Sequence, residues 1–289
     1  MDPSHGAARS TAGLLAFAGT FSRREFLLWL ACIVFANQLL FVPTGDPGTQ
    51  LPSFANLLLS KSVFYYLGWY VVCIRLLESK ADQPASIYDV ALGLFLAAVN
   101  LLPGTASTWL AATGVALFLF FNSRSDDHVR AAAVVLFALC VNGYWGPKIF
   151  DVFAYYLLRA DAALVGSVLH LTQPGMGWHD TIIGQVGGHS VLIFGPCSSF
   201  HNISLGLLCW VSIVKLTRTS WVRTDFIAAF AIVCTVILFN AVRLYLMALS
   251  SEHYEYWHRG PGEQIVAWAT TLAVLAISLW GVARTDRAR

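Results

Sequence analysis

Charged residues are scarce in this chain of 289 residues, since Asp, Glu, Lys and Arg together make up 12% of it. A soluble domain carries roughly twice that share. The 18 basic and 16 acidic side chains leave a net charge of only +2. Such a balance offers no basic patch, so it argues against nucleic acid as a partner.

Paired cysteine and histidine motifs are also missing. The six cysteines stand singly, without the Cys-x-x-Cys spacing of a zinc site or a disulfide framework. No His-Glu-x-x-His pair is present. The sequence therefore predicts no bound metal or cofactor. Five cysteines lie within apolar runs, where a free cysteine packs as a small hydrophobe, and Cys197 is the exception.

Long apolar runs are abundant, because 57% of the residues are hydrophobic. A hydrocarbon core about 30 Å thick needs about 20 apolar residues per helix. We predict an all-α polytopic membrane protein with about eight transmembrane helices. The first follows Ser22 and ends near Val42, and the others cover about 62–77, 88–102, 107–121, 131–145, 198–214, 225–249 and 264–282.

This assignment divides the chain into three parts. A loose cytoplasmic tail covers 1–22, one integral membrane domain covers 23–283, and a basic cytoplasmic tail covers 284–289. Arg23 and Arg24 resemble a twin-arginine export signal. We favour an ordinary first helix with its positive charges inside, because many spans follow and no convincing cleavage site is present.

Two stretches outside the spans have their own patterns. Residues 147–171 are apolar but include several charged side chains, which predicts an amphipathic helix in the outer interface. The alternative is a buried helix with an Arg159/Asp161 pair. Two β-prone runs, 181–186 and 189–194, flank a Gly-Gly pair and predict a short β-hairpin outside the bilayer.

Basic residues at 215–223 and 284–289 argue that both stretches are cytoplasmic. The span from Ser198 then runs inward and the next span runs outward. With a rise of about 1.5 Å per residue, Cys197, Arg243 and His258 all reach the outer face. The lipid bilayer is therefore a partner of the whole domain.

Cys197 opens the predicted helix, after a Gly-Pro pair. Unpaired N–H groups and the positive end of a helix dipole favour the thiolate, which is the reactive form of a cysteine. Ser198 and Ser199 follow as possible cap or hydrogen-bond donors. Taken alone, a single cysteine is more often a packing residue than a nucleophile.

Arg243 and His258 supply the remaining parts of a thiol acyl-transfer site. Inserting an arginine at membrane depth costs about 2.5–3.5 kcal/mol on insertion scales, so such a residue usually has a polar partner or a function. Near a helix end, its side chain can instead reach the lipid head groups. As a catalytic group it would stabilise an oxyanion, and Asn240 one turn earlier could orient it. His258 would be the acid/base, with His201 and His253 as rivals for that role.

Three short motifs in this sequence resemble those of the exosortase/archaeosortase family. They are Cys197-Ser198 at a helix start, Asn240-Ala-Val-Arg243 late in the next helix, and His258-x-x-x-Gly262 shortly after. The resemblance covers about 60–282. Ser199 departs from it, since the family commonly has Gly at that position, and this leaves the subfamily and the substrate signal open.

The resemblance implies a thiol protease or transpeptidase of the bacterial inner membrane, with its active site on the periplasmic side. Its substrates would be membrane-anchored proteins with a C-terminal sorting signal: a short motif such as Pro-Glu-Pro, a transmembrane helix and a basic tail. Cys197 would form a thioester, His258 would move protons and Arg243 would position or stabilise. The alternatives are a non-catalytic membrane protein of exopolysaccharide assembly or transport, and an intramembrane serine protease that uses Ser198 or Ser199.

Overall fold

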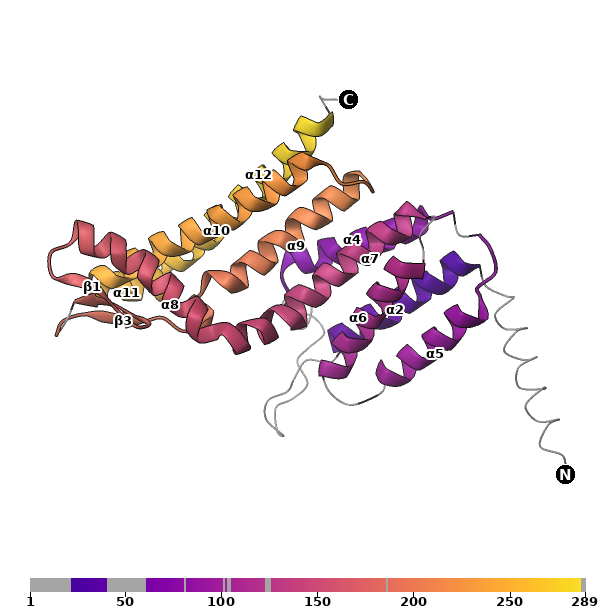
Figure 1. Cartoon of the computed structure of the whole chain (residues 1–289), viewed down its shortest axis with the longest axis horizontal. Helices are drawn as coiled ribbons and strands as arrows, with labels where there is room; N and C mark the ends of the chain where they lie inside the picture. Colours follow the sequence, from indigo (N-terminus) through magenta and orange to yellow (C-terminus); the bar gives the residue numbers. More distant parts are fainter. Residues whose placement is uncertain are drawn as a thin grey trace. The chain divides into compact units, whose positions relative to one another are not determined.

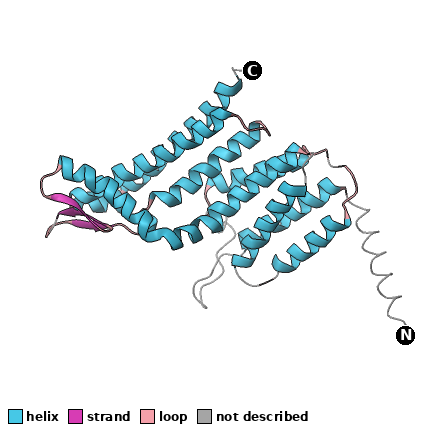
Figure 2. Ribbon diagram, in the orientation of Figure 1, coloured by secondary structure: helices cyan, strands magenta, loops and turns pink. Residues whose placement is uncertain are grey.

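The computed structural model describes residues 22–40, 61–80, 82–100, 102, 105–122, 126–185 and 187–286, and within them it is mostly helical with one small sheet (Figure 2). Two compact units are present. Unit 1 comprises Met1–Cys140 with Arg218–Ser220, and unit 2 comprises Val141–Thr217 with Trp221–Arg289. The sequence did not predict this division. The predicted N-terminal tail, apart from Ser22, and the end of the predicted first span lie outside the described residues.

The described helices of unit 1 are α2 (Arg23–Leu40), α4 (Val63–Leu77), α5 (Ile87–Asn100), α6 (Thr105–Asn122) and α7 (Asp127–Cys140). Capping fixes where α2 begins. The Ser22 hydroxyl accepts from the Glu25 main-chain N–H, and the Glu25 carboxylate accepts from the N–H of Ser22. Arg23 pairs with the buried Asp89 of α5 at 3.3 Å, so the first of the two arginines ties α2 to α5.

Unit 2 begins with the π-turn η1 (Val141–Trp145). Its elements are α8 (Gly146–Thr172), β1 (Met176–His179), β2 (Ile182–Gln185), β3 (Ser190–Leu192), the 3₁₀ turn η2 (Gly195–Cys197), α9 (Ser199–Thr217), α10 (Arg223–Leu249), α11 (Ser251–His258) and α12 (Pro261–Asp286). Helices α9, α10 and α12 pack side by side, while α8, the sheet and α11 gather near one end of α10 (Figure 1).

Within the described residues, three helical stretches are long and apolar enough to cross a membrane: Asp127–Thr172, Arg223–Leu249 and Pro261–Arg284. Four shorter apolar helices lie at Val63–Leu77, Ile87–Val99, Ala106–Asn122 and Asn202–Thr217. The membrane class of the sequence prediction is therefore supported, whereas the number of about eight spans is not confirmed. Helix α12 continues to Asp286, so the first residues of the predicted C-terminal tail are helical.

The predicted helix over 147–171 is present as α8, but it is not separate from the helix before it. The five residues of η1 join α7 to α8 without a break in helical structure. A π-turn suits this junction, because Pro147 has no N–H to donate to the preceding turn. Gly146 is also required there, since a Cβ at this position would lie 2.8 Å from the Val141 carbonyl oxygen.

The predicted hairpin is confirmed as β2 and β3, which pair antiparallel with Ile183 opposite Val191. The structure adds β1 on the other side of β2, so the sheet has the order β1-β2-β3. Gly184 is needed for the pairing. Its φ is +130°, and a Cβ there would lie 2.5 Å from the His189 carbonyl oxygen.

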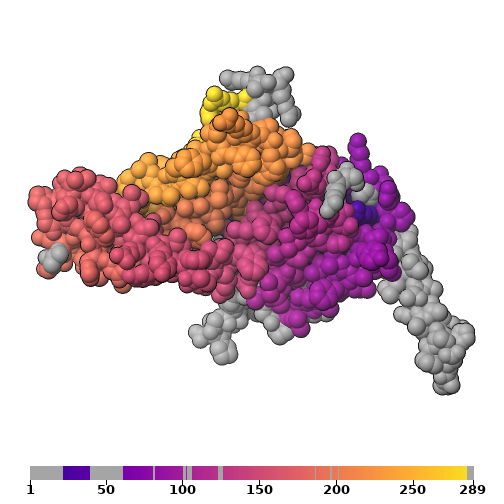
Figure 3. All heavy atoms as spheres, viewed as in Figure 1, coloured from indigo at the N-terminus to yellow at the C-terminus, as the bar shows by residue number. Residues whose placement is uncertain are grey.

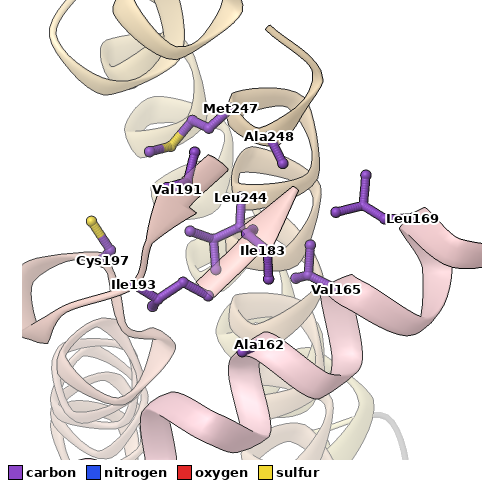
Figure 4. Close-up of a cluster of buried hydrophobic side chains, with 10 residues drawn as sticks. All are labelled: Ala162, Val165, Leu169, Ile183, Val191, Ile193, Cys197, Leu244, Met247 and Ala248. Carbon is purple, nitrogen blue, oxygen red and sulfur yellow. The ribbon is translucent and has the colours of Figure 1, made fainter. Parts of the chain in front are cut away.

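One face of the sheet is buried against α8 and α10. The cluster contains Ala162, Val165 and Leu169 from α8, Ile183, Val191 and Ile193 from the sheet region, Cys197, and Leu244, Met247 and Ala248 from α10 (Figure 4). Each fully buried Val, Leu or Ile contributes about 1.5–3 kcal/mol. This cluster fixes the position of the turn that carries Cys197. In the space-filling view, α8 and the strands form a continuous surface over it (Figure 3).

Candidate functional site

Cys197 ends the 3₁₀ turn η2 and does not open a helix, which corrects the sequence prediction. The Cys197 N–H donates to the Phe194 carbonyl oxygen at 2.8 Å. Ser198 is extended, with φ −74° and ψ 143°, and α9 begins only at Ser199. The Gly-Pro pair before Cys197 favours a tight turn and therefore separates the thiol from the first turn of α9.

Asp161 of α8 holds the two serines after Cys197. Its carboxylate accepts from the Ser198 hydroxyl at 3.1 Å, from the Ser199 N–H at 3.2 Å and from the Ser199 hydroxyl at 2.5 Å. The Ser198 hydroxyl in turn accepts from the Phe200 N–H at 3.3 Å. A carboxylate at the N-terminus of α9 also interacts favourably with the helix dipole. Asp161 thus anchors the chain directly after Cys197.

Asn240 of α10 holds Cys197 itself. Its side-chain amide donates to the Cys197 carbonyl oxygen at 2.9 Å, and Asn240 is buried. The expectation that Asn240 would orient Arg243 is replaced by a direct bond to the main chain of the cysteine. Asn240 of α10 therefore holds the main chain at Cys197, and Asp161 of α8 holds the two residues that follow it.

Arg243 lies one turn further along α10 and joins that helix to α11 and α12. Its Nε donates to the Trp257 carbonyl oxygen at 3.0 Å, and its Nη2 lies 3.8 Å from the Glu263 carboxylate. The side chain of Arg243 is only 13% exposed. Among the described residues, its Nη1 has no hydrogen-bond partner, so one donor remains for a substrate oxygen.

His258 is the last residue of α11 and lies beside the chain that leads to Cys197. Its ring is 6.3 Å from the Phe194 ring and 4.9 Å from the Tyr254 ring, between centroids. Its Nδ1 is buried and has no hydrogen-bond partner among the described residues. No hydrogen bond joins His258 to Cys197 within the described part of the chain.

The two rival histidines are placed differently. The Nδ1 of His253 lies 2.8 Å from the Ser250 hydroxyl at the start of α11, and His253 is exposed. The same hydroxyl accepts the His253 main-chain N–H, so Ser250 caps α11 and the His253 ring lies against this cap. His201 lies in the first turn of α9, and its side chain is outside the described atoms. Arg159 bonds to the Tyr155 hydroxyl, so the alternative Arg159/Asp161 pair is not formed.

The electrostatics keep both reactive groups neutral near pH 7. Burial raises the pKa of the Cys197 thiol, and the nearby Arg243 guanidinium offsets only part of that rise. Burial also lowers the pKa of the His258 imidazole, and the charges of Arg243 and Arg259 lower it further. The sequence had predicted a thiolate favoured by a helix dipole. The structure instead has a buried thiol, and an imidazole whose pKa is lowered.

A cavity of about 420 Å³ lies beside the turn. Its lining comes from the start of α8 and the start of α9: Gly146, Pro147, Phe150, Asp151, Gly195, Phe200 and Ser204. The rings of Phe150 and Phe200 lie 6.0 Å apart, so most of the wall is apolar. The cavity can take an apolar side chain next to Gly195, two residues before Cys197.

Sequence reasoning missed two residues of this site. Asp161 had been considered only as a charge in an apolar helix or as a partner of Arg159, and its actual partners are 37 and 38 residues away. Glu263 drew no attention, because an acidic residue in the first turn of a helix is common. Its carboxylate is the counter-charge of Arg243, and only the fold of α10 onto α12 brings the two together.

Comparison with protein-family models, with curated proteins and with solved structures finds no significant match. Among the described residues, no group of three or more His, Cys, Asp and Glu side chains is arranged to hold a metal ion. The arrangement that remains is a thiol, a guanidinium and an imidazole near one end of α10.

Proposed function

We propose that this protein is a membrane cysteine peptidase or transpeptidase that cleaves C-terminal sorting signals of membrane-anchored proteins. One observation carries the proposal: two contacts tie the turn of Cys197 to the elements that carry Arg243 and His258. Asn240, one turn before Arg243 on α10, donates to the Cys197 carbonyl oxygen, and Phe194, whose carbonyl oxygen accepts the Cys197 N–H, has its ring 6.3 Å from the His258 ring. The motifs shared with the exosortase/archaeosortase family supply the substrate class. The three residues are 46 and 15 positions apart in sequence, so their convergence depends on tertiary structure.

The reaction begins with a proton transfer. His258, neutral near pH 7, accepts the proton of the Cys197 thiol as the sulfur attacks the scissile carbonyl carbon. The C–N bond then breaks, and the amine of the leaving segment takes the proton back from His258. A thioester remains on Cys197. Water or an acceptor amine attacks it, which releases the product and restores the thiol.

Arg243 acts on the oxygen of the scissile carbonyl. Two of its nitrogens are engaged by Trp257 and Glu263, which hold the guanidinium plane in place. The remaining Nη1 is the donor for the oxyanion that develops during attack. Because Arg243 is largely buried, the interaction acts in a medium of low dielectric and is stronger than in water.

The cellular setting follows from the resemblance and from the distribution of basic residues. We place the protein in the bacterial inner membrane as a multi-pass protein, with the end that carries Cys197 toward the periplasm. A sorting signal with a transmembrane helix would then approach along the bilayer and present its polar motif at the outer surface.

One observation favours a second candidate, a non-catalytic membrane protein of exopolysaccharide assembly or transport. Cys197 is only 2% exposed and belongs to the buried cluster, as a cysteine with a packing role would be. In that case Arg243 would serve as a ligand-binding charge.

Substitution of Cys197 by Ala separates the two candidates. A reporter that ends in Pro-Glu-Pro, an apolar helix and a basic tail is co-expressed, and its processing is followed by gel shift. The proposed enzyme loses processing completely in Cys197→Ala. The matched control is Cys209→Ala, a change at a fully buried cysteine in the interior of α9. Equal processing by Cys197→Ala and the wild-type protein would rule out the cysteine mechanism.

A further inference from the structure

The outer edge of β3 is open, whereas the outer edge of β1 is covered. On the β1 side, Trp178 packs closely against Gly166 of α8, and a His170 ring nitrogen lies 3.3 Å from the Met176 carbonyl oxygen. On the β3 side, no further strand pairs with the edge among the described residues. The side chains of Ser190, Leu192 and Phe194 on one face of this strand are also exposed, Leu192 by 57% and Phe194 by 43%. The two edges of this sheet are therefore not equivalent.

The register identifies which main-chain groups face the open edge. The Ile193 N–H donates to the Thr181 carbonyl, and the His189 carbonyl accepts from Gln185, so odd-numbered residues bond to β2. In an antiparallel ladder the groups of alternate residues point to opposite sides. The N–H and C=O groups of Ser190 and Leu192 therefore point away from β2. Among the described residues, they have no main-chain partner on that side.

Natural sheets protect such an edge with charged side chains, proline or a bulge. The stretch Ser190–Phe194 contains no charged residue and no proline. Phe194 is also extended, with φ −134° and ψ 175°, so the edge continues for two residues beyond β3. An unprotected edge of this kind is a template for an added strand.

The edge leads directly to the site described above. The Phe194 carbonyl accepts the Cys197 N–H, and the Phe194 ring faces His258. A strand that pairs with Ser190 and Leu192 is therefore guided along β3 toward the thiol and the imidazole. We infer that the open edge of β3 binds an extended segment of the protein substrate as an additional β-strand and delivers its scissile bond to Cys197.

This inference rests on the proposed function and adds the way in which the substrate is held. Main-chain pairing would supply affinity that depends little on sequence. Side-chain preference would then come from the outward-facing Leu192 and Phe194 and from the cavity beside Gly195.

Leu192→Pro tests the edge because it deletes the outward N–H and leaves the bonds to β2 intact, and proline is tolerated at strand edges. Leu192→Ala is the matched control, since it shortens the same side chain but keeps the N–H. The two full-length variants are compared in detergent at a low, limiting concentration of reporter. We expect the proline variant to process the reporter at least about fivefold more slowly than the alanine variant. Unfolding temperatures of the two variants should agree. Equal processing rates would overturn the inference.

A second measurement uses the wild-type protein and so does not depend on the folding of a variant. Synthetic substrate peptides carry a single N-methyl group at successive positions near the scissile bond. Pairing with one strand edge predicts that methylation slows cleavage at every second position and has little effect between them. Equal effects at all positions, or no effect at any position, would overturn the inference that the substrate pairs with the edge of β3. Continued cleavage by Cys197→Ala would refute the proposed function instead, so the two failures are distinguishable.

Discussion

Replacing Asp161 by Ala should release the chain after Cys197. The carboxylate accepts three hydrogen bonds, from two hydroxyls and one main-chain N–H. A hydrogen bond to a charged group contributes about 1.5–3 kcal/mol, and these three are neither independent nor fully shielded from solvent. Ser198 and Ser199 are 1% and 4% exposed, so their hydroxyls would be left buried without this acceptor. We therefore expect the local free energy of opening to fall by about 2–4 kcal/mol.

Alkylation of Cys197 measures this opening, because the thiol is only 2% exposed and reacts with iodoacetamide when the turn opens. A decrease of about 2–4 kcal/mol corresponds to a roughly 30- to 700-fold faster reaction. The experiment uses the full-length protein in detergent, with the other five cysteines replaced by Ala. The matched control is Asp151→Ala, since Asp151 lies on the same helix and, in the part of the chain that the structure describes, pairs only with the exposed Lys148. An Asp161→Ala rate within twofold of the parent would refute the anchoring role.

Two further predictions concern the charged groups of the site. Arg243→Lys should lower processing of the reporter about 100-fold or more at unchanged protein level. An ammonium group cannot contact both Trp257 and Glu263 and still present a planar donor to the substrate oxyanion. Near-normal turnover would indicate that Arg243 is only a membrane anchor. Because the neutral imidazole is the base and the pKa of His258 is lowered from 6.5, the acid limb of the pH–rate profile should have its midpoint below 6.5. The limb should move lower still in Glu263→Gln, which removes a carboxylate that raises this pKa, and a midpoint at or above 6.5 would contradict the assignment.

Local patterns were sufficient for much of the fold. Alternating β-prone residues around Gly187 and Gly188 predicted the hairpin, since strand periodicity and turn residues are short-range signals. The same signals could not reveal β1, because Met176–His179 has little strand character and is held by pairing with β2 and packing on α8. The helix over 147–171 was predicted as well, but not its continuity with α7 through a π-turn.

Helix ends near Cys197 were harder to predict. The sequence placed the cysteine in the first turn of a helix and therefore predicted an activated thiolate. In the structure, Cys197 lies in a 3₁₀ turn two residues before α9 begins, and burial raises the pKa of its thiol. A difference of two residues is small for a boundary prediction, yet it changes the protonation state from which the proposed reaction starts.

By itself the sequence predicted the membrane class and the hairpin and singled out Cys197, Arg243 and His258 as candidates, because hydropathy, turn chemistry and residue type are local properties. Only the tertiary structure decided what surrounds them. Asp161 reaches Ser198 and Ser199 across more than 35 residues, and Asn240 reaches the Cys197 carbonyl across 43. Such contacts depend on how α8 and α10 pack around the sheet, and helix packing is a collective result that no short stretch encodes.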